Sequence, residues 1–79
     1  MKIPRNVYAK SLIKALRKYG YEETRQVGSH IRLTTELNGL HKITIPNHKP
    51  IKVGTLSAIL TQIGNHHRVS KEDLIKELF

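Results

Sequence analysis

The sequence predicts an α+β fold: a helix, three antiparallel strands and a second helix, followed by a short C-terminal helix. Apolar residues recur at helical spacing over residues 7–19 and again over 54–63, which predicts two helices with one apolar face each. Between them, apolar and polar residues alternate around Asn38-Gly39, a strong signal for a hairpin turn. A chain of 79 residues buries only about 60% of the surface of its unfolded form, so we expect a single domain over residues 1–79 with a modest core.

The first helix is expected over about residues 7–19. Its apolar positions follow the spacing of a helix that buries one stripe: Ala9, Leu12, Ile13, Leu16 and Tyr19. We expect Asn6 to cap its start, because an asparagine side chain accepts a hydrogen bond from a free amide of the first turn. Gly20 is expected to take the left-handed conformation that ends many helices.

Three strands are expected next, over residues 21–26, 29–35 and 40–45. The first pattern is weak because Glu22-Glu23 interrupts the alternation, whereas the second and third alternate clearly. The residues expected to face the helices are Ile31, Leu33, Ile43 and Ile45. Pro46 is expected to end the third strand, since proline has no amide hydrogen to donate to a neighbouring strand.

The second helix is expected over about residues 54–63, ending near Gly64-Asn65, and its apolar positions are Leu56, Ile59, Leu60 and Ile63. The segment from Ser70 to Asp73 resembles a capping box that starts a last, short helix. The apolar side of that helix comprises Leu74, Ile75, Leu78 and Phe79.

A three-stranded sheet with one apolar face has to be covered on that face. The two longer helices can cover it together and leave the opposite face open to solvent. This α-β-β-β-α order is the topology of double-stranded-RNA-binding domains. A shared fold alone does not determine function, so the function has to be argued from particular residues.

The charge of the chain indicates a polyanionic partner. Fourteen Lys and Arg residues stand against six Asp and Glu, which gives a net charge of +8, and nucleic acid is the first candidate. The absence of cysteine excludes disulfides, cysteine-ligated zinc and thiol catalysis. No apolar run reaches the ~20 residues of a membrane span, and the N-terminus does not resemble a signal peptide. We therefore expect a cytoplasmic location and no membrane partner.

One candidate site lies on the face of the sheet that the helices leave open. If Ile31 faces the helices, His30 and Arg32 project from the open face, and Lys42 and Thr44 of the third strand project beside them. A histidine can accept or donate a proton near neutral pH, and cations stabilise the charge that develops on a phosphate. This set fits RNA cleavage, in which the substrate's own 2′-OH is the nucleophile. The alternatives are that His30 is an ordinary surface residue and that Arg32 and Lys42 are plain solvated charges or phosphate contacts.

A second candidate site lies at the start of the second helix. Lys49, Lys52 and the free amides of Gly54 and Thr55 surround the positive end of that helix, an arrangement that binds anions. His48 stands beside them as a further candidate for a phosphate contact. The alternative is that Gly54-Thr55 simply caps the helix. His66 and His67 are adjacent, so their rings would diverge on a helix; we expect neither a metal site nor a small-molecule cofactor.

The order and spacing of several segments resemble HicA-type toxins over residues 3–64. The matching segments are Ile3-Pro4-Arg5, Leu12 to Leu16, Gly20-Tyr21, Arg25-Gln26, Gly28-Ser29-His30, Ile43 to His48, Lys52 to Leu56 and Ile59-Leu60. The Gly-Ser-His motif, together with Pro46-Asn47-His48 and Gly54-Thr55-Leu56, is fairly specific for the family. One departure is Val27, because family members often carry a basic residue just before that motif.

The resemblance implies a fold like that of double-stranded-RNA-binding domains and activity as a ribosome-independent mRNA interferase, encoded beside a HicB-type antitoxin. It implies that His30 is the catalytic residue, with Ser29 of the same motif among the RNA-binding residues. The leading hypothesis is therefore a metal-independent endoribonuclease that leaves a 2′,3′-cyclic phosphate and a 5′-hydroxyl. The alternatives are a non-catalytic RNA-binding module and a basic protein that docks an acidic partner.

Overall fold

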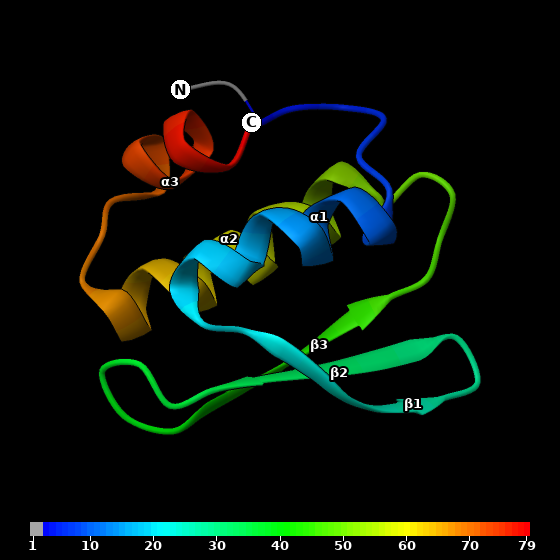
Figure 1. Ribbon diagram of the computed structural model, residues 1–79. Coiled ribbons are helices and arrows are strands. Elements are labelled where there is room, and N and C mark those ends of the chain that lie inside the picture. The colour runs from blue at the N-terminus through cyan, green and yellow to red at the C-terminus, as the bar shows by residue number, and fades with distance from the viewer. Residues whose placement is uncertain (1–2) are drawn as a thin grey trace.

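A computed structural model describes residues 3–79 and confirms the predicted α+β architecture (Figure 1). The elements in chain order are α1 (Ala9–Leu16), the 3-10 helix η1 (Arg17–Tyr19), β1 (Glu22–Val27), β2 (His30–Thr35), β3 (His41–Pro46), α2 (Val53–His67) and α3 (Lys71–Leu78). No helix within the described residues is long and apolar enough to cross a membrane.

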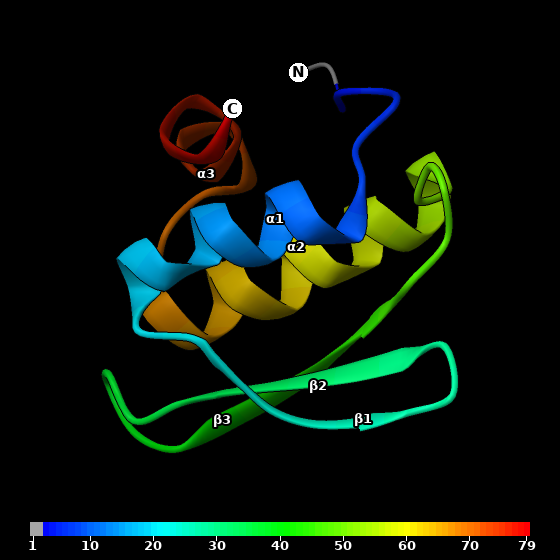
Figure 2. The same cartoon turned by 45° about the vertical axis from the view of Figure 1, so that its right-hand side comes forward.

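The molecule has two layers, with helices on one side of a single sheet. The strands pair antiparallel in the order β1-β2-β3, and α1 and α2 lie side by side over one face (Figures 1 and 2). The completely buried core between the layers includes Leu33 and Ile45 from the sheet and Leu12 and Leu60 from the helices. Helix α3 packs against α1 and α2 on the side away from the sheet. No element of residues 3–79 covers the other face of the sheet, as predicted.

The start of α1 differs from the prediction. The helix begins at Ala9, its N-cap residue is Tyr8, and no side chain caps it. Asn6 lies earlier, in a turn with a φ of 59°, so the prediction that Asn6 caps α1 was wrong. The reason lies in Val7, which is buried and whose carbonyl accepts a hydrogen bond of 2.8 Å from the amide of Ile51. That contact holds the residues before α1 in an extended path. The predicted end was right, since Gly20 is left-handed with a φ of 79°.

The end of α2 also differs from the prediction. The helix does not stop near Gly64-Asn65 but continues to His67, and Arg68, with a φ of 57°, takes the left-handed position that ends it. Gly64 is buried inside the helix, and a Cβ placed there would lie 2.6 Å from the carbonyl oxygen of Val69. This glycine serves a close approach between the helix and the following chain.

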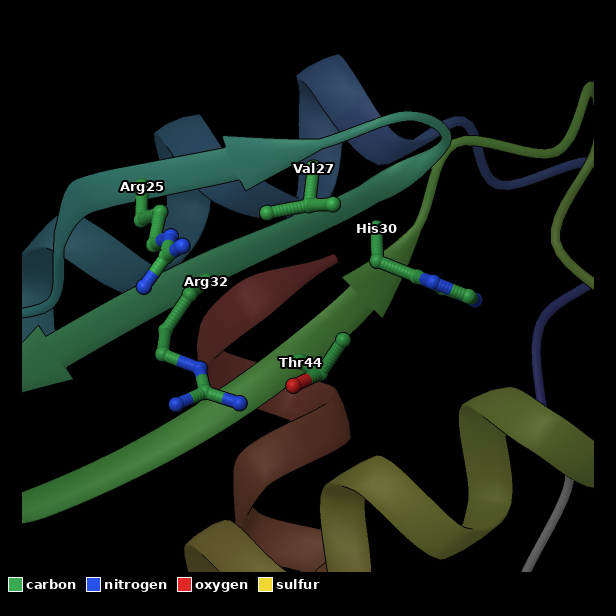
Figure 3. Close-up of a pocket in the computed structure, with 5 residues that line it drawn as sticks. All are labelled: Arg25, Val27, His30, Arg32 and Thr44. Atoms are coloured by element: carbon green, nitrogen blue, oxygen red, sulfur yellow. The ribbon is translucent and has the colours of Figure 1, made fainter.

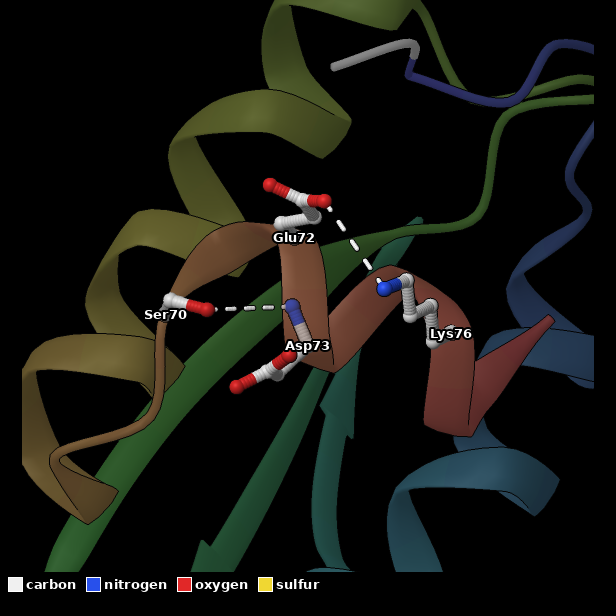
Figure 4. Close-up of polar contacts among 4 residues, drawn as sticks. All are labelled: Ser70, Glu72, Asp73 and Lys76. Carbon is white, nitrogen blue, oxygen red and sulfur yellow. Dashed lines mark hydrogen bonds and ion pairs between the residues drawn. The ribbon is translucent and has the colours of Figure 1, made fainter.

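The predicted cap of α3 is confirmed. The Ser70 hydroxyl accepts a hydrogen bond of 3.1 Å from the amide of Asp73 (Figure 4). One turn further, Lys76 and Glu72 form an exposed ion pair of 3.8 Å. Leu74 and Leu78 are buried, which fixes α3 against the other helices.

A cluster of histidines and tyrosines joins the β2–β3 hairpin to the end of α2. The Tyr21 hydroxyl lies 2.7 Å from Nδ1 of His41 and 3.1 Å from Nε2 of His67. The Asn38 amide nitrogen lies 3.2 Å from Nδ1 of His67, so a donor chain runs from Asn38 through His67 and Tyr21 to His41 when both imidazoles are neutral. Burial, reinforced by the neighbouring His66, lowers the pKa of His41 and of His67. Burial raises the pKa of Tyr21 to about 12, so its hydroxyl stays a donor.

Candidate active site on the open face of the sheet

The β1–β2 hairpin places His30 at one end of the open face. Gly28, with a φ of 59°, forms the turn together with Ser29, and His30 is the first residue of β2. Its neighbours across the sheet are Val27 in β1 and Pro46 in β3, and its side chain is exposed. The amide of Asn47 donates a hydrogen bond of 2.6 Å to the carbonyl of Ser29, which ties the hairpin turn to the loop after β3.

The register of the β1–β2 hairpin adds an arginine to this face. The two-residue turn of Gly28 and Ser29 sets Val27 opposite His30, so Arg25, two residues earlier in β1, stands opposite Arg32 on the same face. Before Arg25 the pairing jumps to Glu23 opposite Leu33, which makes Thr24 an extra residue, a β-bulge.

These side chains line a hollow of about 350 Å³, formed by Arg25, Val27, His30, Arg32 and Thr44 (Figure 3). Arg25 and Arg32 stand opposite each other on neighbouring strands, Val27 lies between Arg25 and His30, and the Thr44 hydroxyl points toward Arg32. The imidazole of His30 points away from the arginines, toward the end of β3. The structure thus brings the predicted pair His30 and Arg32 together and adds Arg25.

The arginines carry unbalanced charge. Like charges directly opposite on neighbouring strands are destabilising, and Arg25 and Arg32 are such a pair. Among residues 3–79 neither of them forms an ion pair with a carboxylate. An oxyanion between the two guanidinium groups would relieve the repulsion and accept charge-assisted hydrogen bonds from both. The hollow can therefore bind a phosphate, and the exposed His30 imidazole would face that phosphate after a rotation about its side-chain bonds.

A second hollow, of about 300 Å³, adjoins the first at the outer edge of the sheet. It is lined by Arg32, Lys42, Ile43, Thr44 and Gln62. Arg32 and Thr44 line both hollows, so the two form one groove that runs from His30 across β3 to helix α2. The predicted residue Lys42 belongs to this second part.

The remaining predicted residues lie at the same end of the sheet as His30 but line neither hollow. Ser29 is in the hairpin turn, and His48 and Lys49 are exposed in the loop that leads from β3 to α2. Lys52 is the N-cap residue of α2, so Gly54 and Thr55 occupy its first turn. The alternative that Gly54-Thr55 caps α2 was therefore wrong, and their amides lie in the turn where helical partners are lacking.

Two polar lining residues were not predicted from the sequence. Arg25 was missed because the first strand was only weakly predicted, with its alternation interrupted by Glu22-Glu23, so its residues were assigned to no face; its place in the Arg25-Gln26 segment gave a signal. Gln62 lies on the exposed side of α2, and nothing in the local sequence indicates that this side borders the edge of β3.

Comparison with known families decides the identity of the chain. A sequence model described as the HicA toxin of bacterial toxin-antitoxin systems matches residues 9–65. The chain belongs to the HicA toxin family. The match spans the whole sheet and every residue that lines the two hollows of this HicA toxin, and it ends before α3.

Membership confirms the resemblance seen in the sequence. HicA toxins are generally RNases and act in pairs with a cognate antitoxin. Searches of the curated proteins and of the solved structures gave no match.

Proposed function

We propose that this HicA toxin is an endoribonuclease that cleaves mRNA in the groove on the open face of the sheet. The observation that carries the proposal is the single hollow shared by His30, Arg25 and Arg32. It combines a group able to transfer a proton with two cations that have no carboxylate partner in the part of the chain that the structure describes.

The chemistry needs few protein groups. The ribose 2′-oxygen attacks the adjacent phosphorus while His30 accepts the 2′-hydroxyl proton, and the bond from phosphorus to the 5′-oxygen breaks. The leaving 5′-oxygen takes a proton from water or from a second acid. Arg25 and Arg32 stabilise the negative charge that the phosphorane gains. The products are a 2′,3′-cyclic phosphate and a 5′-hydroxyl, and since the substrate supplies the nucleophile, neither a metal nor a small-molecule cofactor is needed.

The RNA backbone on the other side of His30 would meet the loop after β3 and the first turn of α2. We propose phosphate contacts there from the Ser29 amide, His48, Lys49, Lys52 and the amides of Gly54 and Thr55. Such contacts give affinity without sequence preference and weaken as salt rises. A HicB-like antitoxin would neutralise the toxin by presenting acidic groups to the same face.

The test is cleavage of an end-labelled RNA, in EDTA, by the wild type and the His30→Ala and His30→Gln variants. Loss of a general base lowers the rate by about 10²–10⁴-fold. We expect both variants to lose that much while they keep most of the RNA affinity. Lys76→Ala serves as the control for removing an exposed basic group, because Lys76 lies on α3 and pairs there with Glu72.

Two outcomes would contradict the proposal. Cleavage that requires magnesium and leaves 3′-hydroxyl ends would rule out attack by the 2′-hydroxyl. RNA binding without cleavage by the wild type would instead identify the chain as a non-catalytic RNA-binding module.

A further inference from the structure

The second hollow has a chemistry that phosphate binding does not account for. Besides the cations Arg32 and Lys42, it is lined by the side chain of Gln62, an uncharged amide that both donates and accepts hydrogen bonds. Among the described residues, no acidic side chain lines it. A site for phosphate alone has no use for an amide acceptor, whereas a nucleobase offers both donors and acceptors.

The edge of β3 adds backbone groups to this hollow. Residues directly opposite in an antiparallel ladder alternate between hydrogen-bonded and non-bonded pairs. The Asn47 amide donates to the Ser29 carbonyl, so these two opposite residues form a hydrogen-bonded pair. Every second pair along the β2–β3 register is then hydrogen-bonded, which makes the pairs of Lys42 and Thr44 non-bonded. The amides and carbonyls of Lys42 and Thr44 therefore point away from β2, toward the outer edge of the sheet. Within residues 3–79, no strand pairs with that edge.

The spacing of the two hollows suits neighbouring nucleotides. Thr44 and Lys42 lie two residues apart on β3, a separation of about 6.6–6.8 Å, and their side chains point to the same face. Thr44 lines both hollows, whereas His30 lines only the first and Gln62 only the second. An RNA strand with its scissile phosphate in the first hollow would therefore place an adjacent base in the second.

We propose that the second hollow binds the base next to the scissile phosphate and that Gln62 and Lys42 select guanine there. This inference rests on the proposed nuclease function. Guanine presents the acceptors N7 and O6 side by side, the pattern that lysine and arginine recognise most often. Its opposite edge carries two donors, N1–H and the 2-amino group, which the Gln62 carbonyl accepts. Adenine places an amino donor where Lys42 also donates, and this mismatch selects against it.

The test compares the single-turnover cleavage rates of short RNAs that differ only in the base next to the scissile phosphate. That base is guanine, 7-deazaguanine, hypoxanthine or adenine. A well-placed pair of hydrogen bonds discriminates between bases by about 5- to 150-fold. We expect the wild type to cleave the guanine substrate at least about fivefold faster than the adenine substrate. Gln62→Leu should abolish the advantage of guanine over hypoxanthine, which lacks the 2-amino group. Lys42→Met should abolish the advantage over 7-deazaguanine, which lacks N7.

Asn65→Ala is the matched control, because Asn65 is an exposed amide one turn further along α2 that does not line the hollow. It should retain the full preference. Equal cleavage of the four substrates by the wild type, or an unchanged preference in Gln62→Leu, would overturn the inference. Binding of the same RNAs to the His30→Ala variant, measured by fluorescence anisotropy, separates the two proposals. A guanine preference in binding supports this site even if the wild type does not cleave.

Discussion

Replacing Gly64 with alanine tests whether this glycine is a packing residue. Alanine in a helix interior is favoured over glycine by about 1 kcal/mol, so propensity alone predicts a more stable protein. The added Cβ would, however, lie 2.6 Å from the carbonyl oxygen of Val69 and 3.4 Å from Cδ1 of Leu74. The first of these atoms is backbone, and it cannot move easily because the Val69 amide bonds to the Gly64 carbonyl at 3.0 Å.

Overpacking of this kind costs about 1–3 kcal/mol, and the contact with a restrained backbone atom places Gly64→Ala in the upper half of that range. After the gain in propensity, we expect a net loss of about 1–2 kcal/mol in the free energy of unfolding. In a domain of this size each kcal/mol lowers the melting temperature by about 4–8 °C.

The assay is urea and thermal unfolding followed by circular dichroism. Gly54→Ala is the matched control, because Gly54 lies in the same helix and its Cβ would meet nothing within 4 Å. This control should be as stable as the wild type or up to about 1 kcal/mol more stable. If Gly64→Ala unfolds at the same or a higher urea concentration than the wild type, the assignment of Gly64 to close packing is wrong.

Two further predictions concern stability. Because the pKa values of His41 and His67 are lowered in the folded protein, the unfolded chain binds more protons, and the free energy of unfolding should fall as the pH drops below about 6.5. The slope is at most about 1.4 kcal/mol per pH unit for each histidine. Urea unfolding at a series of pH values from 8 to 5 measures this slope. A free energy of unfolding that does not change with pH would contradict the assignment of His41 and His67 as neutral in the folded protein. Ser70→Ala should cost about 1 kcal/mol by removing the cap of α3, whereas Lys76→Ala, which breaks only an exposed ion pair, should change thermal unfolding little.

The sequence predicted the fold because its apolar periodicities were strong in both long helices and in β2 and β3. The predicted end of α2 was wrong because Gly64 was read as a glycine that ends a helix. In a sequence, such a glycine cannot be told from one that allows close packing; only the position of the neighbouring chain distinguishes them. Asn6 was misread for a similar reason, since the bond between Val7 and Ile51 joins residues far apart in sequence.

The candidate site was predicted in part. The alternation of β2 placed His30 and Arg32 on the open face, as the structure shows. Arg25 and Gln62 could not be found in this way. The first lies in a strand whose alternation is interrupted, so the pattern assigned its residues to no face, and the second depends on how α2 lies against the edge of β3.

The bulge at Thr24 has a consequence for how this chain can change in evolution. The turn of the β1–β2 hairpin sets Arg25 opposite Arg32, so losing one residue between Gly20 and Arg25 would remove the bulge and keep the twin arginines together. Gaining or losing one residue in the turn at Gly28-Ser29 would instead turn the Arg25 guanidinium toward the helices, because side chains in a strand switch faces with every residue. The length of this turn is therefore constrained more tightly than the length of the stretch before the bulge.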